Sequence, residues 1–486
     1  MLVRMTSTQL TKSDFLSYRQ CAKALWLKKR KPDAVRFPPP SQFDQLLMQD
    51  GYRVEEVVKQ LVAIWPDAEA CEFQTVFETP DGLYARADLV RTLADGSLDI
   101  YEIKGSTSLK SSTGPDHVDD AAFQVMVAER AGYSVRGAHI IHVKKDFVRR
   151  GAIDPLEFLT IADVTTEART RLSTIEADAE SALILLAKAE IDERGCSCRM
   201  IGSRDNQCAS FSYFNPDIPA MSIYLLPRIS KNRIVDFLGD GRLALSDIDP
   251  SEVTLMQVPV LLAAQRGEPQ IDIDCIKSFL NGLVWPLYFY DYETFASAIP
   301  ISDGLRPQQK IPVQYSLHRL SSDGTLEHFE FLSDRPGMQL EMVTQMQQNF
   351  GPVGSLISWF MSFEKSCNTA LAEMFPQTSN FFDDLNARTV DLMDVFKKDY
   401  VDIRFEGSTS IKKVLPVLCP HLQYNGEAVH NGGGAMAAWL ELVETSDDAE
   451  KLRIASELRA YCELDTLAMV EIYRFLERIT ANGVPR

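Results

Sequence analysis

The sequence predicts an α/β protein built from two successive α/β units. Short apolar segments typical of strands alternate with segments of helical periodicity in residues 1–215 and again in residues 285–486. Residues 216–284 contain repeated prolines and glycines between short apolar pieces, which indicates a packed connector. A chain of 486 residues is also long enough to form more than one core.

The composition excludes several classes of protein. With 45% hydrophobic and 24% charged residues, the chain is neither disordered nor collagen-like. A net charge of −18 argues against coating of nucleic acid by the whole surface but permits a local basic groove. Because the amino terminus lacks a signal-peptide pattern and no segment has 18 uninterrupted apolar residues, we expect a cytoplasmic protein without membrane contact.

The first unit begins with helical patterns and continues with strands. Ser13 is a candidate N-cap for a helix over residues 14–27. Asp95-Gly96 favours a hairpin turn between two strands. The remaining predicted elements are a helix over 42–65, strands over 83–90 and 98–104, a helix over 119–131 and a strand over 138–143.

The second unit begins with an aromatic strand over residues 287–293. Further strands are predicted over 313–318 and 355–360, and the last 30 residues have the pattern of a long amphipathic helix. The order of elements is again that of an α/β unit.

A first group of chemically active residues lies on the predicted hairpin. Glu102 and Lys104 are two residues apart and share one face of a strand, and the hairpin can place Asp88 beside them. Phosphodiester hydrolysis needs hard oxygen ligands for a divalent cation and a group that orients or deprotonates water. The alternative for a Glu-x-Lys pair is a solvated strand face with a surface ion pair.

Asp88, Glu102 and Lys104, followed by Gln124 on a helix, resemble the PD-(D/E)xK nuclease superfamily and its RecB-like branch. The resemblance implies that Asp88 and Glu102 bind metal, that Lys104 assists the water and that Gln124 positions the site. Ala128 stands where this branch usually has a Tyr. The candidates for a further upstream metal ligand are Glu55 and Glu56.

Three of the nine cysteines, Cys196, Cys198 and Cys208, lie within 13 residues. Grouped thiolates select zinc or an iron–sulfur cluster, and either site needs four ligands. The similar layout of iron–sulfur RecB-like nucleases implies Cys21 as the fourth ligand and a [4Fe–4S] cluster that joins the two ends of the domain. Zinc and unligated structural cysteines are the alternatives.

A second group of acids lies in the second unit. Asp291 and Glu293 point to one side of an otherwise apolar strand, and Glu364 follows a short strand. Asp465 interrupts the apolar face of the last helix, one turn after Tyr461. Acids in apolar surroundings are costly unless they are paired or bind metal, and four carboxylates can hold two cations about 4 Å apart. A structural role is the alternative for Asp291 and Glu293.

This order of acids resembles the DEDD exonucleases, the DnaQ-like family on a ribonuclease H-like fold, in the variant that carries Tyr. The resemblance implies Mg²⁺ or Mn²⁺ as the cofactor, a water oriented by Tyr461 and 3'-5' exonuclease activity. Glu364 stands where the family normally has Asp, and Asp391 and Asp394 are nearby alternatives. Along nearly the whole chain, the sequence resembles a bacterial family known as a domain of unknown function, which implies no cellular role.

Lys412 and Lys413 are the best candidates for binding nucleic acid, because the preceding segment 407–410 offers hydroxyl and backbone donors to phosphate. Tyr292 and Phe295 could stack on an unpaired base. His430 is a weaker candidate for a phosphate contact.

We therefore expect a metal-dependent nuclease that acts on single-stranded DNA, because both sites must reach a bare phosphodiester and no duplex-reading motif is present. DNA is favoured over RNA as the substrate. The alternatives are a nucleic-acid-binding scaffold with one or both sites inactive, and an RNA-processing exonuclease.

Overall fold

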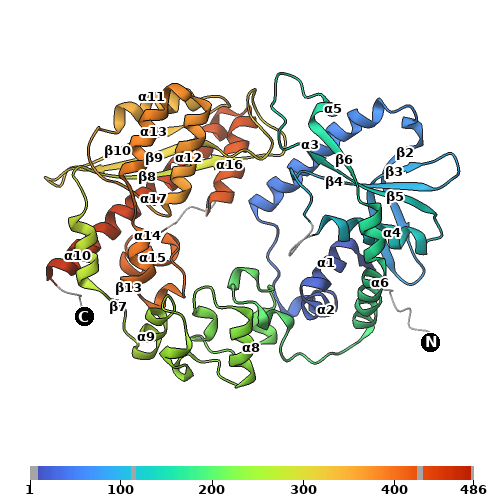
Figure 1. Ribbon diagram of the computed structural model, residues 1–486, viewed down its shortest axis with the longest axis horizontal. Helices are drawn as coiled ribbons and strands as arrows, with labels where there is room; N and C mark the ends of the chain where they lie inside the picture. Colours follow the sequence, from blue (N-terminus) through green and yellow to red (C-terminus); the bar gives the residue numbers. More distant parts are fainter. Residues whose placement is uncertain (1–8, 111–115, 424–428, 430, 483–486) are drawn as a thin grey trace. The chain divides into compact units, whose positions relative to one another are not determined.

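The computed structural model describes residues 9–110, 116–423, 429 and 431–482, and it confirms an α/β protein (Figure 1). The chain divides into two compact units. Unit 1 comprises residues 1–218 together with Ser297–Gln309, and unit 2 comprises Pro219–Ala296 and Lys310–Arg486. His430, one of the residues considered for phosphate contact, lies outside the described residues.

Unit 1 is built around a six-stranded sheet with the order β1-β3-β4-β5-β6, in which β2 also pairs with β3. The β3–β4 pair is the predicted antiparallel hairpin, and β4 runs parallel to β5. The elements of unit 1 are β1 (Leu10–Thr11), α1 (Lys12–Gln20), α2 (Ala22–Arg30), α3 (Gln42–Ala63), β2 (Cys71–Glu78), β3 (Leu83–Thr92), β4 (Leu98–Lys104), α4 (His117–Arg130), β5 (Val135–Val143), α5 (Pro155–Phe158), β6 (Leu159–Asp163), α6 (Thr165–Ala187) and α7 (Phe211–Phe214).

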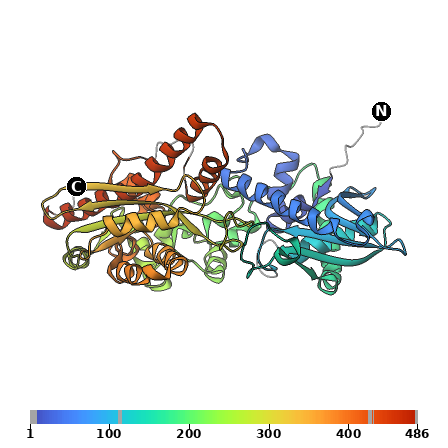
Figure 2. The same cartoon turned by 90° about the horizontal axis from the view of Figure 1, so that it is seen from above.

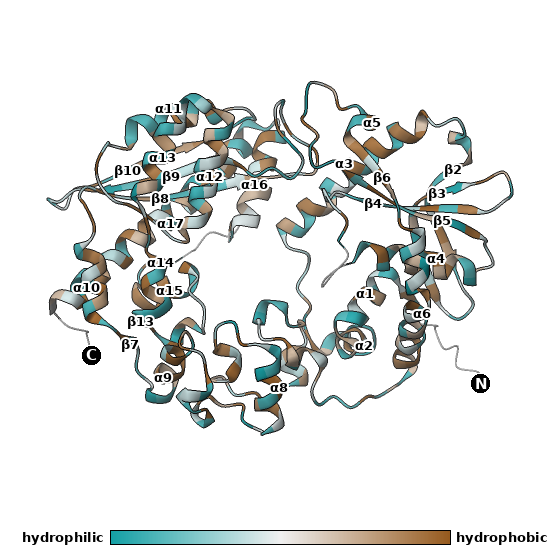
Figure 3. Cartoon of the chain, viewed as in Figure 1, coloured by the Kyte–Doolittle hydropathy of each residue, from teal (hydrophilic) through white to brown (hydrophobic). Residues whose placement is uncertain are grey.

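Helices cover both faces of this sheet. On one face, α4 and α6 pack on alternate strand residues such as Ala87 and Ile100. On the other face, α3 packs through Val54 and Val58 against Leu89 of β3 and Tyr101 of β4. Hydrophobic residues recur along these helices, as expected for elements with one buried face (Figure 3).

The first helix differs from the prediction in two ways. Its N-cap is Thr11 rather than Ser13, with a capping box to Asp14. The predicted helix over 14–27 is broken at Cys21, whose extended backbone (φ −157°, ψ 101°) ends α1 and begins α2. Helical periodicity continues across the break, so the pattern of apolar residues did not reveal it.

Unit 2 contains a five-stranded sheet with the order β10-β9-β8-β11-β12. The strands β8, β9 and β10 form antiparallel pairs, whereas β11 is parallel to both β8 and β12. The elements of unit 2 are α8 (Lys231–Gly239), α9 (Val258–Arg266), β7 (Gln270–Ile271), α10 (Ile273–Asn281), β8 (Leu287–Phe295), β9 (Ile311–Leu320), β10 (Leu326–Leu332), α11 (Gln339–Asn349), β11 (Leu356–Ser358), α12 (Met361–Met374), α13 (Ser379–Arg388), β12 (Thr389–Asp391), α14 (Met393–Lys398), β13 (Tyr400–Val401), α15 (Ile411–Leu418), α16 (Gly432–Glu444) and α17 (Asp448–Asn482).

The two faces of this sheet carry different helices. Leu287 and Phe289 pack in one core with α17, and the intervening Tyr288 and Tyr290 pack in another with α11, α12 and α13. Figure 2 shows α17 in red on one side of the strands and the orange helices on the other. Strand alternation therefore decides which side chains of β8 face the terminal helix.

The boundaries of the units differ from those predicted. The segment 216–284, predicted as a separate connector, belongs almost entirely to unit 2, because β7 pairs with β13 and α10 contributes Ile276 to the core beside α17. The segment Ser297–Gln309 follows β8 in sequence but packs within unit 1. There the side chain of Asp50 accepts a hydrogen bond from the backbone N–H of Ala298 at 2.5 Å.

Candidate functional site

Acidic side chains converge at one pocket in unit 2. Asp291 and Glu293 are two residues apart on β8, so both project from the same face of the strand. They line a pocket of about 340 Å³ together with Asp465 and Tyr461 of α17 and Lys412 of α15. The four-residue spacing of Tyr461 and Asp465 places both on the same side of the helix.

Glu364 comes from a different element from the one expected. The prediction placed it just past a strand, whereas it lies in the first turn of α12. The carboxylate of Asp391 accepts hydrogen bonds from the backbone N–H groups of Phe360 (3.0 Å) and Met361 (3.2 Å), at the start of this helix. Asp391, considered as an alternative acid, therefore supports the helix that presents Glu364, and Asp394 pairs with Lys397 at the surface.

The carboxyl groups in this pocket strongly disfavour each other's ionisation. Burial, followed by repulsion from Asp465, raises the pKa of Asp291 well above its usual range. Burial and the charges of Asp291 and Asp465 do the same to the pKa of Glu293. Burial and the charge of Asp291 raise the pKa of Glu364 to about 10. A bound cation would therefore favour ionisation of the whole cluster.

Lys310 and Lys412 both line this pocket, and Lys412 lies next to Tyr461. Its ammonium group lies 2.7 Å from the hydroxyl oxygen of Tyr461 and 4.8 Å from the centre of the ring. Burial lowers the pKa of Lys412, while the charges of Asp465 and Glu293 act in the opposite direction. Two lysines cannot balance four carboxylates.

The donor set fits a hard divalent cation. All four acids offer oxygen ligands, which Mg²⁺ and Mn²⁺ prefer. The Oε2 atom of Glu364 is buried and has no hydrogen-bond partner among the residues that the structure describes. A buried carboxylate oxygen without a partner is costly, and coordination of a cation would remove that cost.

Unit 1 brings the predicted hairpin residues together. Glu102 on β4 is buried, and its Oε1 atom accepts from Lys104 at 2.7 Å. Its Oε2 atom accepts from Gln124 of α4 at 2.5 Å. Asp88 on β3 accepts from the backbone N–H of Ile103 at 2.8 Å. The order Asp, hairpin, Glu-x-Lys and helix Gln thus corresponds to a real cluster of side chains.

Two further residues of this cluster were missed by the sequence analysis. Lys12 donates to Oε1 of Glu102 at 2.6 Å, and Asp120 accepts from Lys104 at 2.5 Å. Lys12 lies 90 residues from Glu102 in the chain, so no local pattern could connect them. Asp120 lies one helical turn before Gln124 on α4, and this spacing was a usable signal.

The carboxylates of unit 1 differ in their electrostatics. Burial and the charge of Glu102 raise the pKa of Asp88 to about 7. Burial alone would raise the pKa of Glu102, but Lys12 and Lys104 outweigh it and lower the value to about 2. Glu102 is thus an ionised carboxylate held by two lysines, whereas burial and mutual repulsion dominate in the acid cluster of unit 2.

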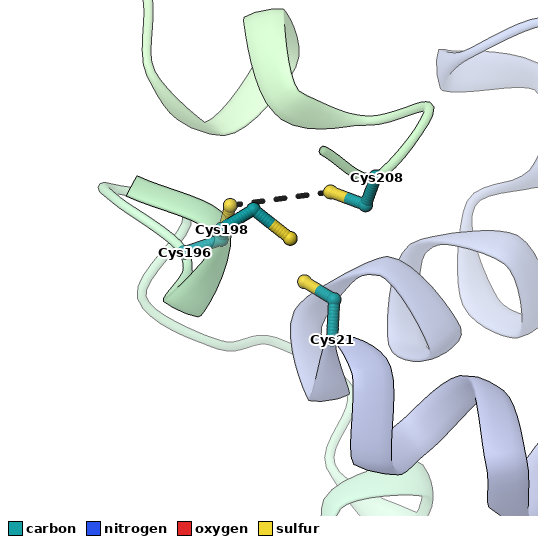
Figure 4. A group of neighbouring side chains, drawn as sticks. All are labelled: Cys21, Cys196, Cys198 and Cys208. Atoms are coloured by element: carbon teal, nitrogen blue, oxygen red, sulfur yellow. Dashed lines mark hydrogen bonds between the residues drawn. The ribbon is translucent and has the colours of Figure 1, made fainter. Parts of the chain in front are cut away.

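Four cysteines meet in unit 1, as Figure 4 shows. The sulfur atoms of Cys21, Cys196, Cys198 and Cys208 all lie within 4.8 Å of one another. The extended backbone at Cys21 separates α1 from α2 and presents this cysteine to the other three (Figure 4). The sulfur atoms of Cys196 and Cys208 are 4.0 Å apart, about twice the length of a disulfide bond. The cluster is therefore a potential metal site.

Several expected contacts are placed elsewhere. Glu55 accepts from Gln74 and pairs with Lys59, and Glu56 also pairs with Lys59, so both acids already have side-chain partners. The predictions for Tyr292 and Phe295 are wrong: both side chains are buried, and Tyr292 donates to Asn368 while Phe295 packs on Trp439. Alternation on β8 turns Tyr292 away from the face of the acids.

Lys413 differs from its neighbour Lys412. Its ammonium group pairs with Glu406 at 2.7 Å, and both side chains are about half exposed. Lys413 is therefore at the surface, whereas Lys412 lines the pocket.

Part of the chain is similar to one protein family and to one relative of unknown function. Residues 288–410 match the family described as "Domain of unknown function (DUF2779)", a segment that contains Asp291, Glu293 and Glu364 but ends before Tyr461. The chain is also 25% identical over 227 residues to a Mycoplasma pneumoniae protein described as "Uncharacterized protein MG366 homolog". That similarity covers 42% of this chain and 34% of the relative, so the chain spans about a third of the relative's length.

One solved structure, titled "Crystal structure of SSO0001", aligns with 38% of this chain and 79% of its own. The TM-score is 0.23 at 12% sequence identity, which is too low to indicate a shared fold.

None of the described helices combines the length and the apolar character that crossing a membrane requires.

Proposed function

We propose that the protein is a metal-dependent nuclease whose main catalytic centre is the acid pocket of unit 2. The observation that supports this most strongly is the convergence of Asp291, Glu293 and Asp465 on one pocket that also contains Tyr461 and Lys412. Glu364 is not among the residues that line the pocket, but its carboxyl group interacts directly with that of Asp291. These residues come from different elements, so local sequence pattern alone does not explain their meeting.

The four acids would hold Mg²⁺ or Mn²⁺. When bound, such ions supply positive charge that polarises a phosphodiester and activates water. Tyr461 presents its hydroxyl group at the pocket and orients the attacking water by hydrogen bonding. The ammonium group of Lys412 donates a hydrogen bond to that hydroxyl oxygen and so holds it in place. The resemblance to the DEDD exonucleases supports 3'-5' polarity on single-stranded DNA as the proposed reaction.

Unit 1 is proposed as a second nuclease site of the RecB-like type, in which Asp88 and Glu102 bind the cation. One observation favours a second candidate function for this unit, namely binding of nucleic acid without cleavage. Both oxygens of Glu102 already accept hydrogen bonds, from Lys12 and Lys104 at Oε1 and from Gln124 at Oε2. A metal ion at Glu102 would have to displace at least one of these donors.

The cysteine cluster is proposed to hold a structural metal cofactor. The resemblance to iron–sulfur RecB-like nucleases supports a [4Fe–4S] cluster. The sulfur spacing supports the alternative, zinc, because a tetrahedral Zn–thiolate site with bonds of about 2.3 Å has sulfur atoms about 3.8 Å apart. The visible spectrum and the iron and zinc content of anaerobically purified protein distinguish the two. Cys21→Ser should lose the metal, whereas the exposed Cys275 provides the control Cys275→Ser.

The activity is tested with a 3'-labelled and a 5'-labelled single-stranded oligonucleotide in Mn²⁺. Asp291→Asn should abolish trimming if the pocket of unit 2 is the catalytic centre, and Asp323→Asn, in the β9–β10 turn, is the control. Lys104→Ala tests unit 1 separately, with Lys145→Ala as its control. Trimming that survives in Asp291→Asn and disappears in Lys104→Ala would assign the activity to unit 1.

The same assay distinguishes the two remaining alternatives, a nucleic-acid-binding scaffold and an RNA-processing exonuclease. Binding of the oligonucleotide without cleavage at any Mn²⁺ concentration would favour the scaffold. Faster trimming of an RNA version of the same oligonucleotide would favour an RNA-processing exonuclease.

A further inference from the structure

A third cluster of potential metal ligands lies in unit 2. It consists of His318 on β9, His328 on β10 and Glu463 on α17. One ligand atom from each residue lies within 4.8 Å of the other two. Neither the nuclease proposal nor the compared proteins assign a role to these side chains.

Strand pairing brings the two histidines together. His318 and His328 are directly opposite each other in the antiparallel β9–β10 pair, and their rings stack with centres 4.5 Å apart. Cross-strand neighbours on one face have Cβ atoms about 5 Å apart, a separation that lets two side chains reach a common ion.

Hydrogen bonds orient both rings. Nδ1 of His318 lies 2.8 Å from the hydroxyl oxygen of Thr466, and Nε2 of His328 lies 2.9 Å from that of Ser316. The remaining nitrogens are Nε2 of His318 and Nδ1 of His328. Metal-binding histidines characteristically use one nitrogen for the ion and the other for such an orienting bond.

Glu463 completes the cluster. Its carboxylate lies 3.7 Å from Nδ1 of His328. The side chains of His328 and Glu463 are 23% and 47% exposed, so an ion can reach them from solvent. His318 is buried, which lowers its pKa to about 4 and keeps the ring neutral, as ligation requires.

We propose that His318, His328 and Glu463 form a zinc site. Two imidazoles and one carboxylate are a donor set that suits Zn²⁺, whereas the all-oxygen set of the acid pocket suits Mg²⁺ or Mn²⁺. Tetrahedral zinc needs donor atoms about 3.3 Å apart, so each pair of donor atoms has to move together by at most about 1.5 Å on binding. The exposed side chain of Glu463 can supply most of this movement, and the stacked rings turn toward the ion.

The site would tie the β9–β10 hairpin to α17. Glu463 lies between Tyr461 and Asp465 in the sequence of this helix. A zinc ion held there would fix the part of α17 that presents both residues to the acid pocket. The zinc site itself does not depend on whether the acid pocket cleaves nucleic acid.

The test is a titration of the full-length protein with Zn²⁺, with the cysteine cofactor in place and with Mg²⁺ present in excess. His328→Gln and Glu463→Gln each remove one ligand from a partly exposed position, and His421→Gln is the control because His421 is exposed elsewhere in unit 2. We expect one zinc equivalent in the wild type and the control, and at least about a tenfold loss of affinity in both variants. Circular dichroism and melting curves establish that the variants fold.

Co²⁺ provides an independent readout. The proposed ligands predict visible d–d bands without a thiolate-to-cobalt charge-transfer band, and these bands should disappear in His328→Gln. Equal zinc binding by the wild type and both variants, or cobalt spectra that arise from thiolates alone, would show that the proposal is wrong.

Discussion

The ammonium group of Lys412 lies 2.7 Å from the hydroxyl oxygen of Tyr461, in a pocket that is otherwise rich in carboxylates. The lysine belongs to α15 and the tyrosine to α17. The contact joins a residue first considered for phosphate binding to the one proposed to orient water. In the proposed reaction, Lys412 would therefore act through Tyr461 as well as through its charge.

Lys412→Met should reduce the cleavage rate by about 10²-fold, because it removes both the cation and the partner of Tyr461. Tyr461→Phe should cause a loss of similar size. If the two residues act as one unit, the double variant should lose little more than either single variant. Single-turnover rates of the four proteins measure this coupling, and Lys398→Met, at an exposed position, is the control. Fully multiplicative losses would contradict a shared role.

The pKa of Glu364 predicts how metal-free protein responds to pH. Its value rises from 4.5 to about 10 on folding, so the folded protein keeps a proton that the unfolded chain releases above pH 4.5. The free energy of unfolding should therefore fall as pH rises from about 5 to 9 in chelator. Glu364→Gln should flatten this dependence, and so should saturating Mg²⁺, which replaces the proton as the compensating charge.

Melting temperatures across this pH range in chelator provide the measurement. Glu341→Gln is the matched control, because that side chain is 52% exposed on α11. A pH dependence that is unchanged in Glu364→Gln would mean that this carboxyl group is ionised in the folded protein.

Glu102→Gln should destabilise unit 1, because it leaves the ammonium groups of Lys12 and Lys104 without their shared carboxylate. The loss should be about 3 kcal/mol, as for other mostly buried ion pairs from which one partner is removed. Chemical denaturation of unit 1 measures the effect. Glu180→Gln removes an ion pair with Arg130 at the surface of unit 1 and should cost less than about 1 kcal/mol. Equal effects would show that burial of Glu102 has no energetic importance.

Asp50→Ala should loosen the segment Ser297–Gln309, since the backbone N–H of Ala298 loses its buried acceptor. The expected cost is about 2 kcal/mol. Limited proteolysis should then cut within this segment before other sites. Asp303→Ala, on the same segment but largely exposed, should have a smaller effect. Cleavage rates that match the wild type would show that Asp50 does not hold the segment.

Local sequence pattern was sufficient for much of the fold. The hairpin of β3 and β4 followed from apolar alternation around Asp95-Gly96, and it placed Asp88 near Glu102 as expected. The spacing of Asp291 and Glu293, and that of Tyr461 and Asp465, likewise determined which residues share a face. These features depend on neighbours a few positions apart, and such periodicity is visible in a single sequence.

The sequence by itself thus determined an α/β protein with two groups of acids and with cysteines that could bind a metal. Only the tertiary structure decided that Lys12 contacts Glu102, that Lys412 contacts Tyr461 and that His318, His328 and Glu463 lie together. It also decided that Ser297–Gln309 packs within unit 1. These contacts join residues that are far apart in the chain, and they form because packing of whole helices and sheets brings distant segments together, which local propensity does not encode.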